Sequence, residues 1–118
     1  MILAFLGLLL AGGPLGQQQD RPEPTPMKCE SGPVYRVFGG TPWLVYGCDD
    51  GASVVVVSGP GSPASPFYFL VAFNDGAYRI TGEGNGDQAA TGAAFEELKS
   101  LDRSAISALA EEAGRTSD

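Results

Sequence analysis

The chain contains no histidine. This absence excludes histidine triads, histidine-ligated zinc sites and acid–base catalysis by an imidazole. Basic residues are scarce as well: seven Lys and Arg, scattered singly, stand against fourteen Asp and Glu and leave a net charge of −7. Because phosphate binds clustered positive charge, we expect no nucleic-acid partner, and an anionic membrane surface is disfavoured on the same ground.

Long apolar runs are nearly absent. The exception is MILAFLGLLLA at residues 1–11, which the small-residue stretch GGPLGQQQ follows. A membrane-spanning helix needs about 20 apolar residues, so we predict no membrane span and interpret residues 1–16 as a signal peptide. The expected product is periplasmic or secreted. The alternative is a cytoplasmic chain whose translation starts at Met27, which would leave the apolar run unexplained.

The rest of the chain divides into three parts. Residues 17–27, QQQDRPEPTPM, contain three prolines and almost nothing apolar. Burial cannot offset the entropy of ordering such a segment, so we predict a flexible tether. Residues 28–114 have the length of one small domain, and residues 115–118 are expected to form a disordered tail.

Cysteine occurs only twice, at Cys29 and Cys48. An even number in an exported chain favours a disulfide. Closing this loop would stabilise the fold by about 3 kcal/mol on the chain-entropy model. The alternative, a reactive thiol, has no histidine in the chain to activate it. We therefore predict a structural bridge.

Turn-forming residues cut the domain into strand-length pieces rich in β-branched and aromatic residues. The pieces are residues 33–38, 42–48, 52–58, 67–73 and 77–82. Because the connections between them are short, the sequence predicts an antiparallel meander of four or five strands.

The strand register follows from residues 75–76, where Asp-Gly supplies the positive φ that a tight hairpin requires. A two-residue loop places Phe73 opposite Tyr78, and the next pair is Val71 with Ile80. The predicted core face of this hairpin is Phe67, Phe69, Val71 and Phe73 with Tyr78 and Ile80.

The C-terminal quarter changes its period. Apolar residues recur with the spacing of an amphipathic helix, at Ala94, Phe95, Leu98, Leu101, Ala105 and Leu109. Ile106 is out of phase with Leu101, and either Asp102 or Ser104 offers a new N-cap, so one long helix and two helices both remain open. Gly114 is the predicted C-cap. The predicted fold class is α+β, with a C-terminal helix or helix pair packed on one face of the meander.

The middle strands lack the polar alternation of a sheet with one face in water. Residues 54–57 read VVVV and residues 67–73 read FYFLVAF, so both faces are apolar. We therefore predict that the outer face, with Tyr68 and Leu70, is an association surface. A second helix, the tether, a protein partner or another copy of the chain in a homo-oligomer would cover it.

The single tryptophan, Trp43, shares a strand face with Val45 and Gly47. A core position beside a small neighbour is one interpretation. An interface position is the other, because tryptophan is common in binding hot spots. The candidate interface residues are therefore Trp43, Tyr68 and Leu70.

The glycine-rich stretch TGEGNGDQ, at residues 81–88, lacks the G-x-G-x-x-G spacing of a dinucleotide site and is predicted to be a flexible loop. Glu83, Asn85 and Asp87 echo the first half of a calcium loop. The sharp-turn glycine and the bidentate glutamate of that loop are missing. We predict no metal site and no cofactor.

Hydrolysis by a carboxylate pair would use Asp49 with Asp50, or Glu83 with Asp87. Such catalysis needs carboxyl groups that face each other across a cleft, whereas adjacent aspartates on a hairpin tip point into water. We predict no catalytic residue.

The block CESGPVYRVFGGTPWLVYGCDDG, with the later SPFYFLVAFNDG and the alanine-rich helix, resembles small exported proteins of unknown function from α-proteobacteria. The resemblance covers about Cys29 to Gly114, and it implies bacterial export without naming an activity. The sequence therefore favours a non-enzymatic binding or envelope-associated module that self-associates or binds a protein. The alternative is a small hydrolase or inhibitor-like protein that uses the loop at residues 59–66 or 82–87.

Overall fold

The computed structural model describes residues 27–116, so the predicted signal peptide, most of the predicted tether and residues 117–118 lie outside it. Five strands are followed by two helices. Their bounds are β1 Ser31–Phe38, β2 Thr41–Gly47, β3 Val54–Ser58, β4 Phe67–Asn74, β5 Ala77–Gly84, α2 Gln88–Ser100 and α3 Arg103–Thr116. The strands form one sheet in the order β1-β2-β3-β4-β5, with every neighbour antiparallel. The predicted α+β meander is confirmed, with five strands and a helix pair.

The predicted register of the last hairpin is also confirmed. Phe73 pairs with Tyr78, and Val71 pairs with Ile80. Asp75 and Gly76 form the turn with φ values of 53° and 80°. Both angles lie in the left-handed region that a two-residue hairpin turn needs, and Asp and Gly reach this region at low cost.

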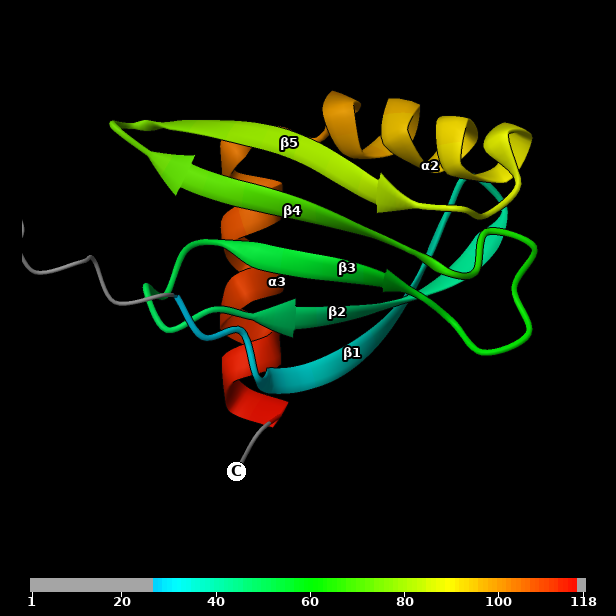
Figure 1. Ribbon diagram of the computed structural model, residues 1–118. Coiled ribbons are helices and arrows are strands. Elements are labelled where there is room, and N and C mark those ends of the chain that lie inside the picture. The colour runs from blue at the N-terminus through cyan, green and yellow to red at the C-terminus, as the bar shows by residue number, and fades with distance from the viewer. Residues whose placement is uncertain (1–26, 117–118) are drawn as a thin grey trace, which may run out of the picture.

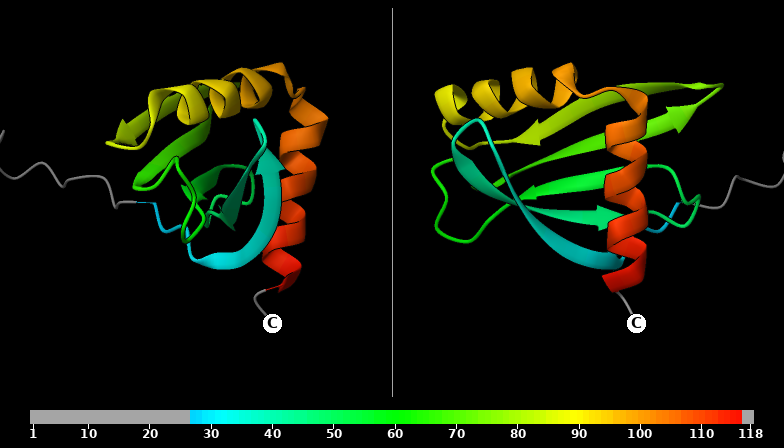
Figure 2. Two further views of the ribbon diagram at one scale, coloured as in Figure 1. Left: turned by 90° about the vertical axis from the view of Figure 1, so that its right-hand side faces the viewer. Right: turned by 180° about the vertical axis from the view of Figure 1, so that it is seen from behind.

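Both helices pack on the same side of the sheet, as Figures 1 and 2 show. α3 crosses β1, β2 and β3. α2 lies beside β4 and β5, where the Phe95 ring is 6.2 Å from the Phe69 ring. The core lies between this face of the sheet and the helices, and burying each large side chain there contributes about 1.5–3 kcal/mol. Its least exposed large members are Trp43, Val45, Val54, Val56, Val71 and Leu98.

The two-helix alternative is the correct one. Leu101 has extended backbone, and Asp102 caps the second helix because its Oδ1 accepts hydrogen bonds from Ala105 N at 2.8 Å and Ser104 Oγ at 3.0 Å. These hydrogen bonds lower the pKa of the Asp102 carboxyl. Starting a new helix at this point changes the phase of the pattern and turns Ile106, only 4% exposed, into the core.

The predicted helix end at Gly114 is wrong, because α3 continues to Thr116. The Thr116 hydroxyl donates a hydrogen bond to the Glu112 carbonyl one turn earlier, at 2.9 Å. The first two residues of the predicted tail are therefore helical. A glycine two residues before a helix end is tolerated, since it costs about 1 kcal/mol relative to alanine and does not break the hydrogen-bond ladder.

The glycine-rich segment was expected as a flexible loop, but its first half is strand. β5 extends through Gly84, which pairs with Phe67. An added Cβ at Gly82 would lie 2.8 Å from the Phe67 ring and 3.0 Å from the Phe69 ring. Glycine is thus required here to make room for two aromatic rings, which is a packing role rather than a loop signal.

Cys29 and Cys48 form the predicted disulfide, across a sequence separation of 19 residues. It joins the segment before β1 to the residue after β2. A backbone hydrogen bond from Asp49 N to the Lys28 carbonyl, at 2.7 Å, lies beside it. A disulfide is consistent with an oxidising compartment. Within residues 27–116, neither helix has the length and apolar character needed to cross a membrane.

Candidate binding face

The sheet face opposite the helices is apolar across four adjacent strands. In Figure 1 the sheet lies in front of α3, so this face is turned toward the viewer. We call it the open face and define it by the side chains that alternate with the core residues. They are Tyr35, Val37, Leu44, Tyr46, Val55, Val57, Tyr68, Leu70 and Ala72.

The register arranges the open face in rows. Tyr46, Val55, Leu70 and Thr81 form one row across β2 to β5, and Tyr35, Leu44, Val57, Tyr68 and Glu83 form the neighbouring row across all five strands. Tyr35 is 64% exposed, Val37 63% and Tyr68 42%. Large apolar side chains that stay this exposed in one contiguous patch are typical of an interaction surface.

β5 adds charge along one side of the open face. Arg79, Thr81 and Glu83 alternate outward, opposite Ala72, Leu70 and Tyr68 respectively. The Tyr68 hydroxyl donates to Glu83 Oε1 at 2.9 Å. This hydrogen bond and the charge of Glu83 raise the pKa of Tyr68. Within residues 27–116, the structure records no hydrogen bond or ion pair of the Arg79 side chain.

A shallow groove of about 780 Å³ lies at one end of the open face. Two segments proposed from sequence as working loops meet there: Asn85 N donates to the Pro66 carbonyl, and Asp87 N donates to the Pro63 carbonyl, both at 2.9 Å. We call it the edge groove. Its lining is Val55, Val57, Ser58, Ser65, Pro66, Phe67, Tyr68, Glu83, Gly84 and Asn85.

Of the three candidate interface residues, only Tyr68 and Leu70 lie on the open face. Trp43 points to the helices and is 0% exposed. Its Nε1 donates to the Phe38 carbonyl at 3.2 Å and to Thr41 Oγ1 at 3.0 Å, and its ring is 5.3 Å from Phe69. The interface interpretation of Trp43 is therefore corrected: the indole is a core group with a satisfied N–H.

The Asp50 carboxylate organises the turn between β2 and β3. Its Oδ1 accepts from Ala52 N at 2.9 Å and Ser53 N at 2.8 Å, and its Oδ2 accepts from Ser53 Oγ at 2.6 Å. Partial burial raises the pKa of Asp50, but these hydrogen bonds outweigh it and lower the pKa below its ordinary value. The Asp50 contacts also explain why β3 begins at Val54, two residues later than predicted, because the preceding amides bind the carboxylate.

The carboxylates of the other proposed pair, Glu83 and Asp87, each accept a hydrogen bond within the fold. Asp87 caps α2, since its Oδ2 accepts from Ala90 N at 3.1 Å, and Glu83 accepts from Tyr68. Neither proposed pair faces its partner across a cleft. Over residues 27–116 the structure contains no group of three or more His, Cys, Asp and Glu side chains arranged to hold a metal ion.

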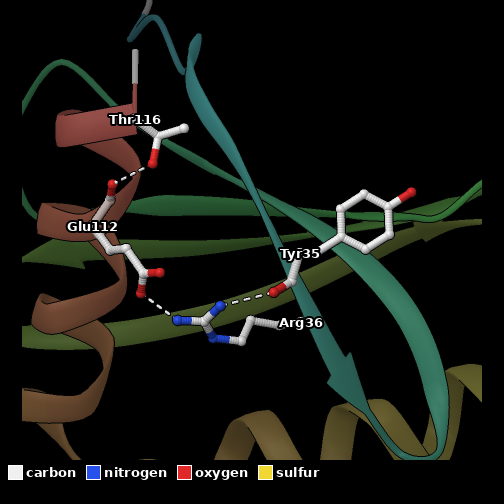
Figure 3. A network of polar contacts seen from close by, with 4 residues as sticks. All are labelled: Tyr35, Arg36, Glu112 and Thr116. Atoms are coloured by element: carbon white, nitrogen blue, oxygen red, sulfur yellow. Dashed lines mark hydrogen bonds and ion pairs between the residues drawn. The ribbon is translucent and has the colours of Figure 1, made fainter. Parts of the chain in front are cut away.

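Sequence reasoning missed one polar network, which Figure 3 shows. Arg36 lies on the helix side of β1, where its guanidinium donates to the Tyr35 carbonyl at 2.8 Å and pairs with the Glu112 carboxylate of α3. The sequence signal for this network was Arg36 itself, a charged residue at an inward-facing position between the buried Val34 and Phe38. This network links α3 to the edge strand β1, which is a structural role.

Over residues 27–116, the fold is an α+β arrangement with a five-stranded meander, one face of which lies under two helices while no helix or strand of these residues covers the apolar second face. No protein-family model, no curated protein and no solved structure matches the chain.

Proposed function

We propose that this protein is an exported, non-enzymatic binding module that contacts a protein through the open face. One observation carries the proposal: apart from Asn74 at the end of β4, β1 to β4 project only apolar and aromatic side chains from that face, and both helices pack on the other side. Tyrosine is among the commonest hot-spot residues of protein interfaces, and the open face contains three of them, Tyr35, Tyr46 and Tyr68.

Export is supported from two directions. The disulfide between Cys29 and Cys48 suits an oxidising compartment. The apolar run at residues 1–11 has the character of a signal-peptide core. Together they favour a periplasmic or secreted location for the binding module.

The edge groove supports the second candidate, an inhibitor-like or hydrolytic protein, less well. Glu83 is the one carboxylate in its lining, and Tyr68 already binds it. Two-carboxylate hydrolysis needs a second acidic group facing the first across the substrate. The groove therefore favours use as an extension of the binding face.

Site-specific photo-crosslinking in the cells that produce the full chain tests the proposal. A photoreactive phenylalanine analogue would replace Tyr68 or Tyr35 on the open face, and Ala89 on the exposed side of α2 would serve as the matched control. We expect irradiation to give a discrete covalent adduct from the two tyrosine positions and none from the control. Absence of any adduct from both tyrosine positions would contradict the proposal.

A further inference from the structure

We infer that the open face binds a second copy of this chain, packed sheet against sheet about a two-fold axis. The inference rests on the proposed function and names its partner. Charge placement gives the first support. The chain carries a net charge of −7, yet β1 to β4 project no charged side chain from the open face, so two such faces can approach without bringing like charges together.

β5 provides charges that are complementary to themselves. Arg79 and Glu83 are both exposed, carry opposite signs and lie two residues to either side of Thr81 on the same face. A two-fold operation makes residue i contact residue j and residue j contact residue i. If the axis runs across the strands at Thr81, Arg79 meets Glu83 of the second copy, and the reverse pair forms at the same time.

The same axis follows a row of the sheet that suits close packing. Thr81 lies in the row with Leu70, Val55 and Tyr46. Residues on this row would face their own counterparts, and all of them except Thr81 are partly buried already by neighbours in the sheet. The centre of the interface would thus be apolar and the Arg79–Glu83 pairs would lie at its rim, which is the usual anatomy of a protein interface.

Side-chain size fits the same operation. Tyr68 and Ala72 lie one row to either side of the axis, so the Tyr68 ring of one copy would pack over Ala72 of the other. A large ring opposite a small side chain lets facing layers interdigitate. The hydrogen bond from the Tyr68 hydroxyl occupies Glu83 Oε1, which leaves the other carboxylate oxygen to accept from Arg79.

The product would be a four-layer assembly, with two sheets inside and the helices of each copy outside. Aligned sheets pack about 10 Å apart with their strands crossing at roughly 30°. This arrangement would cover Tyr68 without moving either helix, so the core described above would stay intact on binding.

Charge reversal at the two β5 positions tests this register. Sedimentation equilibrium of the full chain, as purified from the producing cells in its oxidised form, would compare the wild type with Arg79→Glu, Glu83→Arg and the double variant. Arg115→Glu, an exposed change on α3, is the matched control. We expect a dimeric wild type, a rise of at least about tenfold in Kd for each single reversal, recovery to within about threefold in the double variant and no change in the control.

Three results would overturn the inference. A dimer that neither reversal weakens would place the contact elsewhere, and a double variant as weak as the singles would reject the two-fold register. A wild type that stays monomeric at about 100 µM, which is well above a dimer Kd of about 1 µM, would reject the second copy. In the last case an adduct from Tyr68 to another protein would leave the proposed function standing, whereas no adduct would remove both. Circular dichroism of each variant confirms that the monomer is folded.

Discussion

The two faces of the sheet are built from similar side chains but have different surroundings. On the helix face Trp43, Val56 and Phe69 are at most 2% exposed, because α2 and α3 lie over them. On the open face Tyr35 and Val37 are more than 60% exposed, although they come from the same strand as the buried Phe38. Burial under α2 and α3 therefore accounts for the apolar residues of the helix face only. The exposed apolar residues of the open face are the basis of the proposed protein contact.

The largest difference in unfolding free energy is expected when one aromatic residue on each face is replaced by alanine. Trp43→Ala should lower the free energy of unfolding by about 3–5 kcal/mol, because it removes a fully buried ring and leaves a cavity. Tyr35→Ala should change it by less than about 1 kcal/mol in dilute protein. Urea unfolding followed by circular dichroism measures both. Equal losses would show that the two faces are covered alike.

A smaller change in the free energy of unfolding is expected at the Asp50 turn, which joins β2 to β3. Asp50→Asn should cost about 1 kcal/mol near neutral pH, since it weakens hydrogen bonds to a charged acceptor. The pKa of Asp50 is lower in the folded protein than its ordinary value of 3.8. The charged form therefore stabilises the fold above that value, and this contribution is lost as the pH falls through the lowered pKa.

The measurement is the unfolding free energy of wild type and Asp50→Asn between neutral and acidic pH. Their difference should hold steady above pH 4 and shrink below it. Asp49→Asn is the matched control, because its exposed neighbouring carboxylate accepts none of the turn hydrogen bonds described above. A difference that grows on acidification would contradict the assigned sign.

The smallest free-energy effect is expected for the ion pair between Arg36 on β1 and Glu112 on α3. Arg36 and Glu112 are both 38% exposed in their side chains, so solvent screens their ion pair. A double-mutant cycle with Arg36→Gln and Glu112→Gln should give a coupling below about 1 kcal/mol. A coupling of several kcal/mol would mean that α3 depends on this pair rather than on apolar packing.

Local patterns were enough to predict much of this fold. The Asp-Gly turn at residues 75–76 fixed the β4–β5 register, and the unbroken apolar strands led to the open face with Tyr68 and Leu70. A period of two identifies which residues share a face but not which face the helices cover. For that reason Trp43 remained ambiguous until the structure placed it in the buried core that includes residues of α2 and α3.

The errors arose where a local signal competed with long-range packing. The glycine-rich stretch at residues 81–88 suggested a loop, but β5 continues past the predicted strand end at Gly82 to Gly84, and Gly82 leaves room for the Phe67 and Phe69 rings. Gly114 suggested a helix end, but α3 continues past it. The meeting of the two loops at the edge groove and the pairing of Arg36 with Glu112, 76 residues away, have no local signature at all.

The disulfide gives this one sequence two different stabilities. In a reducing compartment Cys29 and Cys48 would remain thiols, and the native state would lose about 3 kcal/mol, a large share of the 5–15 kcal/mol that typically separates folded from unfolded chains. On the proposed route of export, the reduced chain would thus be easier to keep unfolded before it crosses a membrane than the oxidised chain afterwards. Closing the bridge restores that stability, so the fold that carries the open face is most stable in an oxidising compartment.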